Sequence, residues 1–104
     1  MEFKGTPGSW LHADSYGLNE TAGGAIHGDG KTLCLVLGKG IGKEKATANA
    51  KLMAAAPELL DALIKIVEMN QQYAIDKYGD VKKAEEMACV RTARAAINKA
   101  LGRE

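Results

Sequence analysis

Residues 57–67 read PELLDALIKIV, and this stretch decides the fold. Its large aliphatic side chains recur every three or four residues, as they do on one face of an α-helix, at Leu59, Leu60, Leu63, Ile64 and Val67. Proline suits the first turn of a helix, so Pro57 marks the start, and the carboxylate of Glu58 suits the positive end of the helix dipole. The sequence therefore predicts a helix over residues 58–77 that buries an apolar stripe.

A second long helix is predicted downstream, over residues 81–101. Gly79 is suited to the left-handed residue after a helix end, and Asp80 can cap the helix that follows. Two helices of this length joined by a short turn form an antiparallel helical hairpin about 30 Å long.

An earlier helix is predicted to begin near Lys43, because Ala46, Ala50 and Met53 share one helical face. Pro57 ends it, since proline disfavours helical backbone in the residue before it.

The first 42 residues differ in composition, since they hold most of the glycines and the only tryptophan. Asp29-Gly30 is a dipeptide that two-residue β-turns prefer, and the segments beside it can be extended. The expected fold class is α+β: a small N-terminal antiparallel sheet of two or three strands with a hairpin near Asp29-Gly30, followed by about three helices. We expect one domain over residues 1–104, with a β-rich front at 1–42 and a helical back at 43–104.

The length of the helical hairpin predicts self-association. A hairpin of about 30 Å is longer than the small sheet can cover, so apolar surface would remain exposed in a single copy. We expect a homo-oligomer, most simply a two-fold dimer, in which helices 58–77 and 81–101 form a four-helix bundle.

Charge and cysteine content indicate the setting. The chain of 104 residues has 14 Lys plus Arg and 13 Asp plus Glu, a formal net charge of +1, which gives no reason to expect a nucleic-acid or membrane surface. No apolar run is long enough to span a membrane. Cys34 and Cys89 are far apart and form no CxxC pair, so we expect reduced, buried thiols in a cytoplasmic protein.

The loop GKGIGK at 38–43 raises the question of phosphate binding. It fails the Walker pattern, because Gly42-Lys43 is followed by Glu44, and it fails the dinucleotide pattern, because it follows a hairpin. Free amides at a helix start beside Lys39 and Lys43 could still bind an anion, with Gly40 in the turn. The alternative is a solvated linker.

Three further residues could complete such a site. Trp10 and Tyr16 could stack on a nucleobase, although a lone tryptophan in a small sheet is more often a core residue. Asn49 could line a pocket or make a local polar contact.

His12 and His27 could face each other across the sheet, but no metal-binding spacing supports a role. We therefore predict no catalytic residue, no metal and no cofactor.

Two segments, TPGSW at 6–10 and ATANAKLMAAAPELLDAL at 46–63, resemble a group of small proteins encoded by bacteriophages and prophages. Ser9 replaces the usual proline of that group, and Met53 the usual isoleucine. The resemblance implies a phage protein in the host cytoplasm, and the missing catalytic motifs imply a non-enzymatic accessory role.

This combination leaves several non-enzymatic roles open, and two of them are counter-defence mechanisms. The first is sequestration of a phosphate-containing nucleotide signal, bound by Trp10, Tyr16 and Asn49 together with the loop residues Lys39, Gly40, Gly42 and Lys43. The alternative is a protein-binding inhibitor of a host defence complex, or a structural or regulatory phage factor.

Overall fold

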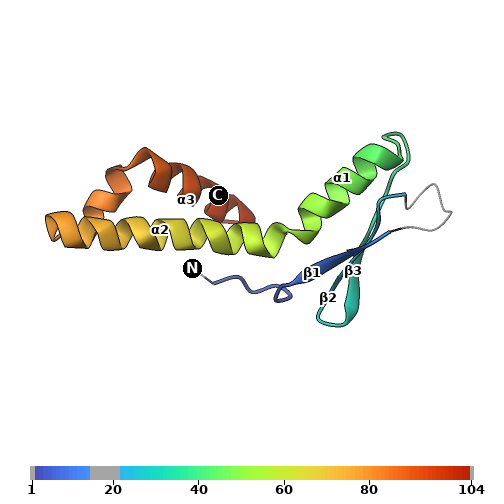
Figure 1. The fold of residues 1–104 in the computed structure, drawn as a ribbon, viewed down its shortest axis with the longest axis horizontal. Helices are drawn as coiled ribbons and strands as arrows, with labels where there is room; N and C mark the ends of the chain where they lie inside the picture. The colour runs from blue at the N-terminus through green and yellow to red at the C-terminus, as the bar shows by residue number, and fades with distance from the viewer. Residues whose placement is uncertain (1, 15–21, 104) are drawn as a thin grey trace. The chain divides into compact units, whose positions relative to one another are not determined.

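The structure is a computed structural model that describes residues 2–14 and 22–103. Three strands come first and helices follow, so the predicted α+β class is confirmed (Figure 1). The elements are β1 (Trp10–Ala13), β2 (Gly24–Gly28), β3 (Lys31–Val36), α1 (Lys43–Ala54), α2 (Ala56–Tyr78), the short 3-10 helix η1 (Val81–Glu86) and α3 (Ala88–Ala100).

The three strands form one antiparallel sheet in the order β1-β2-β3. Asp29 and Gly30 connect β2 to β3 with φ values of 52° and 73°, as a tight two-residue hairpin turn requires, so the predicted hairpin is confirmed. The register shifts between Ile26 and His27, where Leu33 is an extra residue in β3. One face of the sheet holds Ile26, which is almost completely buried.

Helix α1 covers that face of the sheet with small side chains. Ala46 and Ala50 are fully buried, and Ala50 packs with Ile26 and Val36 in the core of this part of the chain. Met53, which was expected on the same face, is exposed. Ala54 packs there instead, because the buried positions of α1 follow each other every four residues.

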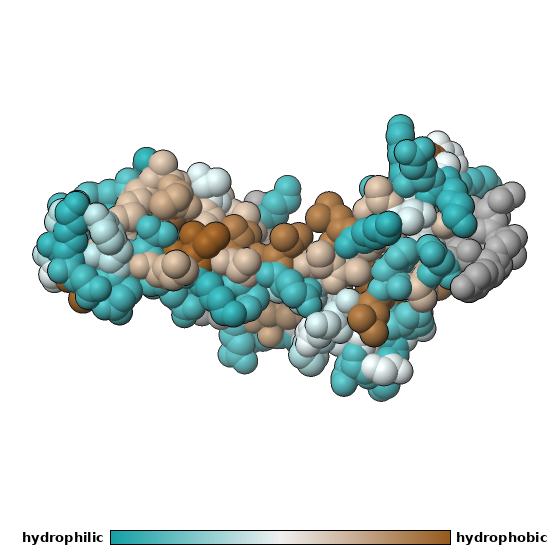
Figure 2. Space-filling view, in the orientation of Figure 1, coloured by the Kyte–Doolittle hydropathy of each residue, from teal (hydrophilic) through white to brown (hydrophobic). Residues whose placement is uncertain are grey.

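Residues Lys4–Glu58 form one compact unit, and the chain from Leu59 onwards, with the N-terminal residues up to Phe3, forms another. Each unit has a hydrophobic core of its own. The second core lies between α2 and α3, where hydrophobic residues gather in the space-filling view (Figure 2).

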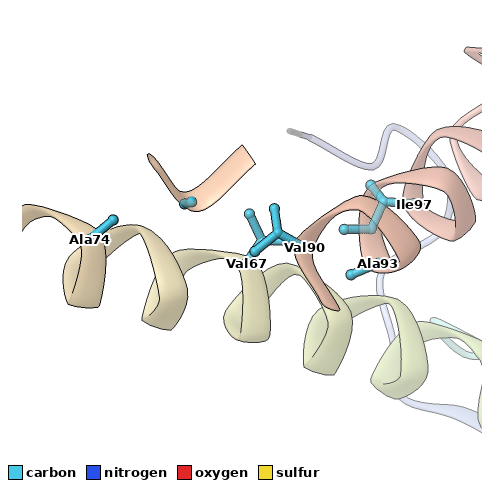
Figure 3. Packing of buried hydrophobic residues seen from close by; sticks show 6 residues of the cluster. Val67, Ala74, Val90, Ala93 and Ile97 are labelled. Atoms are coloured by element: carbon cyan, nitrogen blue, oxygen red, sulfur yellow. The ribbon is translucent and has the colours of Figure 1, made fainter. Parts of the chain in front are cut away.

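The core of the second unit is small and aliphatic. Val67 of α2 and Val90 of α3 point toward each other, with Ala93 and Ile97 beside them (Figure 3). Val67, Val90 and Ile97 have no exposed surface. This packing explains why the stripe that begins in residues 57–67 folds as a helix.

The segment after α2 differs from the single helix predicted over 81–101. Gly79 has a φ of 66°, and Oδ1 of Asp80 accepts a hydrogen bond from the backbone N–H of Lys82 at 2.9 Å, so both predicted end signals are confirmed. However, η1 stops at Glu86, Met87 has extended backbone (φ −78°, ψ 132°), and α3 begins only at Ala88. The break lets Ala84 join the buried core beside α2, a tertiary contact that outweighs helix propensity.

Both cysteines are exposed, so their predicted burial is wrong. Cys34 lies on β3, an edge strand, and Cys89 lies in the first turn of α3, next to the buried Val90. Among the described residues, no helix combines the length and the apolar character needed to cross a membrane.

Candidate functional site

The loop between β3 and α1 is a tight turn built on glycine. The carbonyl oxygen of Gly38 accepts hydrogen bonds from the N–H groups of Ile41 and Gly42, at 3.2 and 3.0 Å. Gly40 and Gly42 have φ values of 85° and 88°, which side chains other than glycine rarely tolerate. The glycines are therefore required by the backbone path from strand to helix, whether or not an anion binds.

The first turn of α1 begins at Gly42, which has no side chain to cap it. The backbone N–H of Ala46 donates a hydrogen bond to the carbonyl oxygen of Gly42 at 3.1 Å, and no side-chain hydrogen bond caps the helix start. Lys39 and Lys43 are exposed beside these backbone amides. Glu44 is in the same turn, so a carboxylate already occupies part of the positive end of the helix dipole.

Four of the predicted binding residues, Lys39, Gly40, Gly42 and Lys43, therefore lie together in this turn. Asn49 is exposed on α1, six residues after Lys43 and so about 9 Å further along the helix axis. Tyr16 lies outside the described residues.

Trp10 lies at the opposite end of the sheet from this loop. It pairs with Gly28, which pairs with Lys31 at the start of β3, whereas the loop follows Val36 at the other end of that strand. Five residues of extended chain span about 17 Å. The half-buried indole packs on the sheet core and donates a hydrogen bond from Nε1 to the carbonyl of Thr6 at 3.1 Å. The packing of Trp10 therefore supports a role as a core residue of the sheet, not as a stacking residue beside the loop.

The two histidines do not face each other. His12 pairs with Ile26 and His27 with Leu11, so the two imidazoles lie on opposite faces of the sheet. Nε2 of His12 is 2.8 Å from the carbonyl oxygen of Gly23. Within residues 2–14 and 22–103, no group of three or more His, Cys, Asp or Glu side chains could hold a metal ion.

The two segments that suggested a phage family meet in space. A Cβ added to Gly8, in TPGSW, would lie 2.6 Å from Cβ of Pro57, in the segment 46–63. Only glycine allows this approach, and the Thr6 carbonyl of the same segment accepts the hydrogen bond from Trp10. The packing of the N-terminal segment thus gives a structural reason for Gly8 and for Trp10 in TPGSW.

Two exposed apolar surfaces lie outside the predicted binding residues. One is the edge strand β3, where Leu33 and Leu35 are exposed, together with Leu37 directly after the strand. The other is the side of α2 that carries Ile66 and Met69. The length of the helical hairpin predicts that apolar surface remains exposed, but it does not identify these residues. Their heptad spacing is the signal that could have found them, whereas the exposed edge of β3 depends on the order of strands in the sheet.

Comparison with known protein families gives a match over the whole chain. The family described as Salmonella phage P22 protein Y8K6 matches residues 1–104, which is the whole chain. Neither the curated proteins nor the solved structures contain a match. The predicted membership in a phage protein family is confirmed, and the chain belongs to the family of Salmonella phage P22 protein Y8K6.

Proposed function

We propose that this phage-family protein is a non-enzymatic accessory factor that binds a host protein in the cytoplasm, in the manner of a counter-defence inhibitor. The observation that carries the proposal is the outer edge of β3. This strand is the last in the order β1-β2-β3, and within the described residues no other strand pairs with its outer edge. An unpaired edge offers backbone N–H and C=O groups to an extended segment of a partner.

The side chains around this edge favour such a partner. Leu35 pairs with Ala25, one residue from the buried Ile26, so it lies on the face of the sheet that α1 does not cover. Leu11 of β1 lies on the same face and is also exposed. A strand added beside β3 would gain hydrogen bonds from the edge and apolar contacts from this face.

The experiment compares capture of host proteins by the wild-type chain and by Leu35→Lys. Leu52→Lys is the matched control, because Leu52 is exposed to a similar extent, 64% against 59% for Leu35, but lies on α1. We expect one host protein to be captured by the wild type and by Leu52→Lys and to be lost with Leu35→Lys. The same protein bound equally by all three would place the contact elsewhere.

Sequestration of a nucleotide signal is the second candidate, and the uncapped start of α1 favours it. The backbone amides of the first turn, with Lys39 and Lys43, would bind the phosphate groups of such a signal. Because Trp10 lies at the far end of the sheet, the base would have to be held by other residues.

A thermal-shift screen with cyclic di- and trinucleotides tests this candidate. A bound ligand at a hundred times its Kd stabilises the folded protein by about 2.7 kcal/mol. The shift should disappear in Lys39→Ala/Lys43→Ala and persist in Lys51→Ala/Lys65→Ala, which removes two lysines away from the loop. A shift that survives the first double variant would exclude the loop as the site.

A further inference from the structure

Helix α2 has two apolar stripes, and α3 covers only one of them. The covered stripe includes Val67 and Ala74. The second stripe, here named the outer seam, consists of Leu59, Ala62, Ile66, Met69 and Tyr73. At 100° per residue the outer seam is centred about 120° away from the covered stripe.

The outer seam follows the heptad pattern of a coiled coil. Its members are separated by three, four, three and four residues, the spacing of alternating a and d positions. No charged residue interrupts it between Leu59 and Tyr73, and Asp76, at the next d position, ends it. If α2 packed against α3 alone, one apolar stripe would be enough, so the second stripe points to a further contact.

The large side chains of the outer seam are exposed. Leu59, Ile66, Met69 and Tyr73 retain between 41% and 70% of their full exposure. At roughly 100 Å² each, they present about 400 Å² of apolar surface per copy. A standard interface buries about 800 Å² per partner, of which somewhat more than half is apolar, so the outer seam is large enough for a specific contact.

We propose that the outer seam binds the outer seam of a second copy of this chain, with the two α2 helices antiparallel. A heptad seam is complementary to another helix with the same repeat, because each a or d side chain fits between four side chains of its partner. A two-fold axis between Ile66 and Met69 would bring each of these residues opposite the other in the second copy. This self-association is independent of the host-protein contact at β3.

Helix dipoles favour the antiparallel arrangement. With the two-fold axis between Ile66 and Met69, the positive N-terminal end of each α2 helix lies at the level of the negative C-terminal end of the other, whereas parallel helices would align like ends.

Tyr73 is prepared for burial in such a contact. Nζ of Lys77 donates a hydrogen bond to the Tyr73 hydroxyl at 2.9 Å, and this hydrogen bond raises the pKa of Lys77. The phenol therefore already has a polar partner at the edge of the seam, and its ring can be covered without loss of a hydrogen bond.

Sedimentation velocity on the full chain tests the proposal with a matched pair of variants. Ile66→Glu places a charge in the outer seam. Ile75→Glu is the control, because Ile75 is nine residues later, on the opposite side of α2, and is similarly exposed, 46% against 41%. We expect the wild type and Ile75→Glu to sediment as dimers at twice the chain mass of 11.0 kDa, and Ile66→Glu to sediment as a monomer.

Circular dichroism on the same samples separates association from folding. Both variants should keep the helix content of the wild type. If Ile66→Glu loses helix content, Met69→Lys takes the place of Ile66→Glu in the comparison, because Met69 is the most exposed residue of the seam. A monomeric wild type at about 100 µM, a dimeric seam variant that remains folded, or equal dissociation by Ile75→Glu would each overturn the proposal.

Discussion

Replacement of Ile97 by alanine tests the packing between α2 and α3. Ile97 has no exposed surface and lies in one cluster with Val67, Val90 and Ala93 (Figure 3). The substitution removes three carbon atoms, which costs about 2.4 kcal/mol of transfer free energy at about 0.8 kcal/mol per methylene. The cavity adds to this, because the neighbouring valines and alanines are too short to fill it, so we expect a loss of about 3 to 4 kcal/mol in the free energy of unfolding.

Urea unfolding followed by circular dichroism at 222 nm measures this loss, since the helices dominate the signal. At one fixed protein concentration, Ile97→Ala should lower the midpoint strongly at an unchanged denaturant slope. Ile75→Ala, which truncates an exposed isoleucine of the same unit, should change the free energy of unfolding by about 0.5 kcal/mol or less. Equal effects of the two substitutions would show that α3 does not pack on α2 as described.

Substitutions at three further positions probe local contacts, and thermal melts measure the stability of each variant. Gly8→Ala should cost about 1 to 3 kcal/mol, because the new methyl group would overlap Pro57, and a variant as stable as the wild type would contradict that contact. Gly79→Ala should cost about 1 kcal/mol because of its φ of 66°, with Gly79→Asn less costly; equal stability of all three proteins would argue against the left-handed turn. Asp80→Ala should lose about 1 kcal/mol with the hydrogen bond from the N–H of Lys82, and Asp80→Asn should retain most of it; no difference between these two would exclude the cap.

Much of the fold could be predicted because local rules and packing agree. Asp29-Gly30 and Gly79-Asp80 specify their turns through backbone conformations that few other residues adopt. The stripe that includes Val67 predicts a helix with a buried side, and α2 buries it. These features depend on neighbours in the sequence, so a single sequence suffices to recognise them.

The failures concern contacts between distant residues. The break at Met87 depends on Ala84 packing in the core with α2, which the good helix propensity of this segment conceals. The predicted burial of Cys34 is wrong because a continuous apolar run, LCLVL at 33–37, does not show whether its strand lies at the edge or in the centre of a sheet.

The candidate site was predictable only in part for the same reason. The turn at 38–43 is local, so its glycines and lysines come together as expected. Trp10 is separated from it because the strand order places the start of β1 beside Gly28, at the hairpin end of the sheet. The outer seam needed both kinds of information: its heptad spacing is local, but only the position of α3 shows that this stripe is uncovered.

The most direct test of the antiparallel α2 contact is a distance between two copies measured by pulsed electron paramagnetic resonance. A spin label is attached at Glu58→Cys in a chain whose two exposed cysteines, Cys34 and Cys89, are replaced by serine. With the two-fold axis between Ile66 and Met69, the labelled positions of the two copies should be separated by about 30 Å, at 1.5 Å per residue. A separation of about 10 to 15 Å would indicate parallel helices, and the absence of any distance between copies would contradict the contact itself.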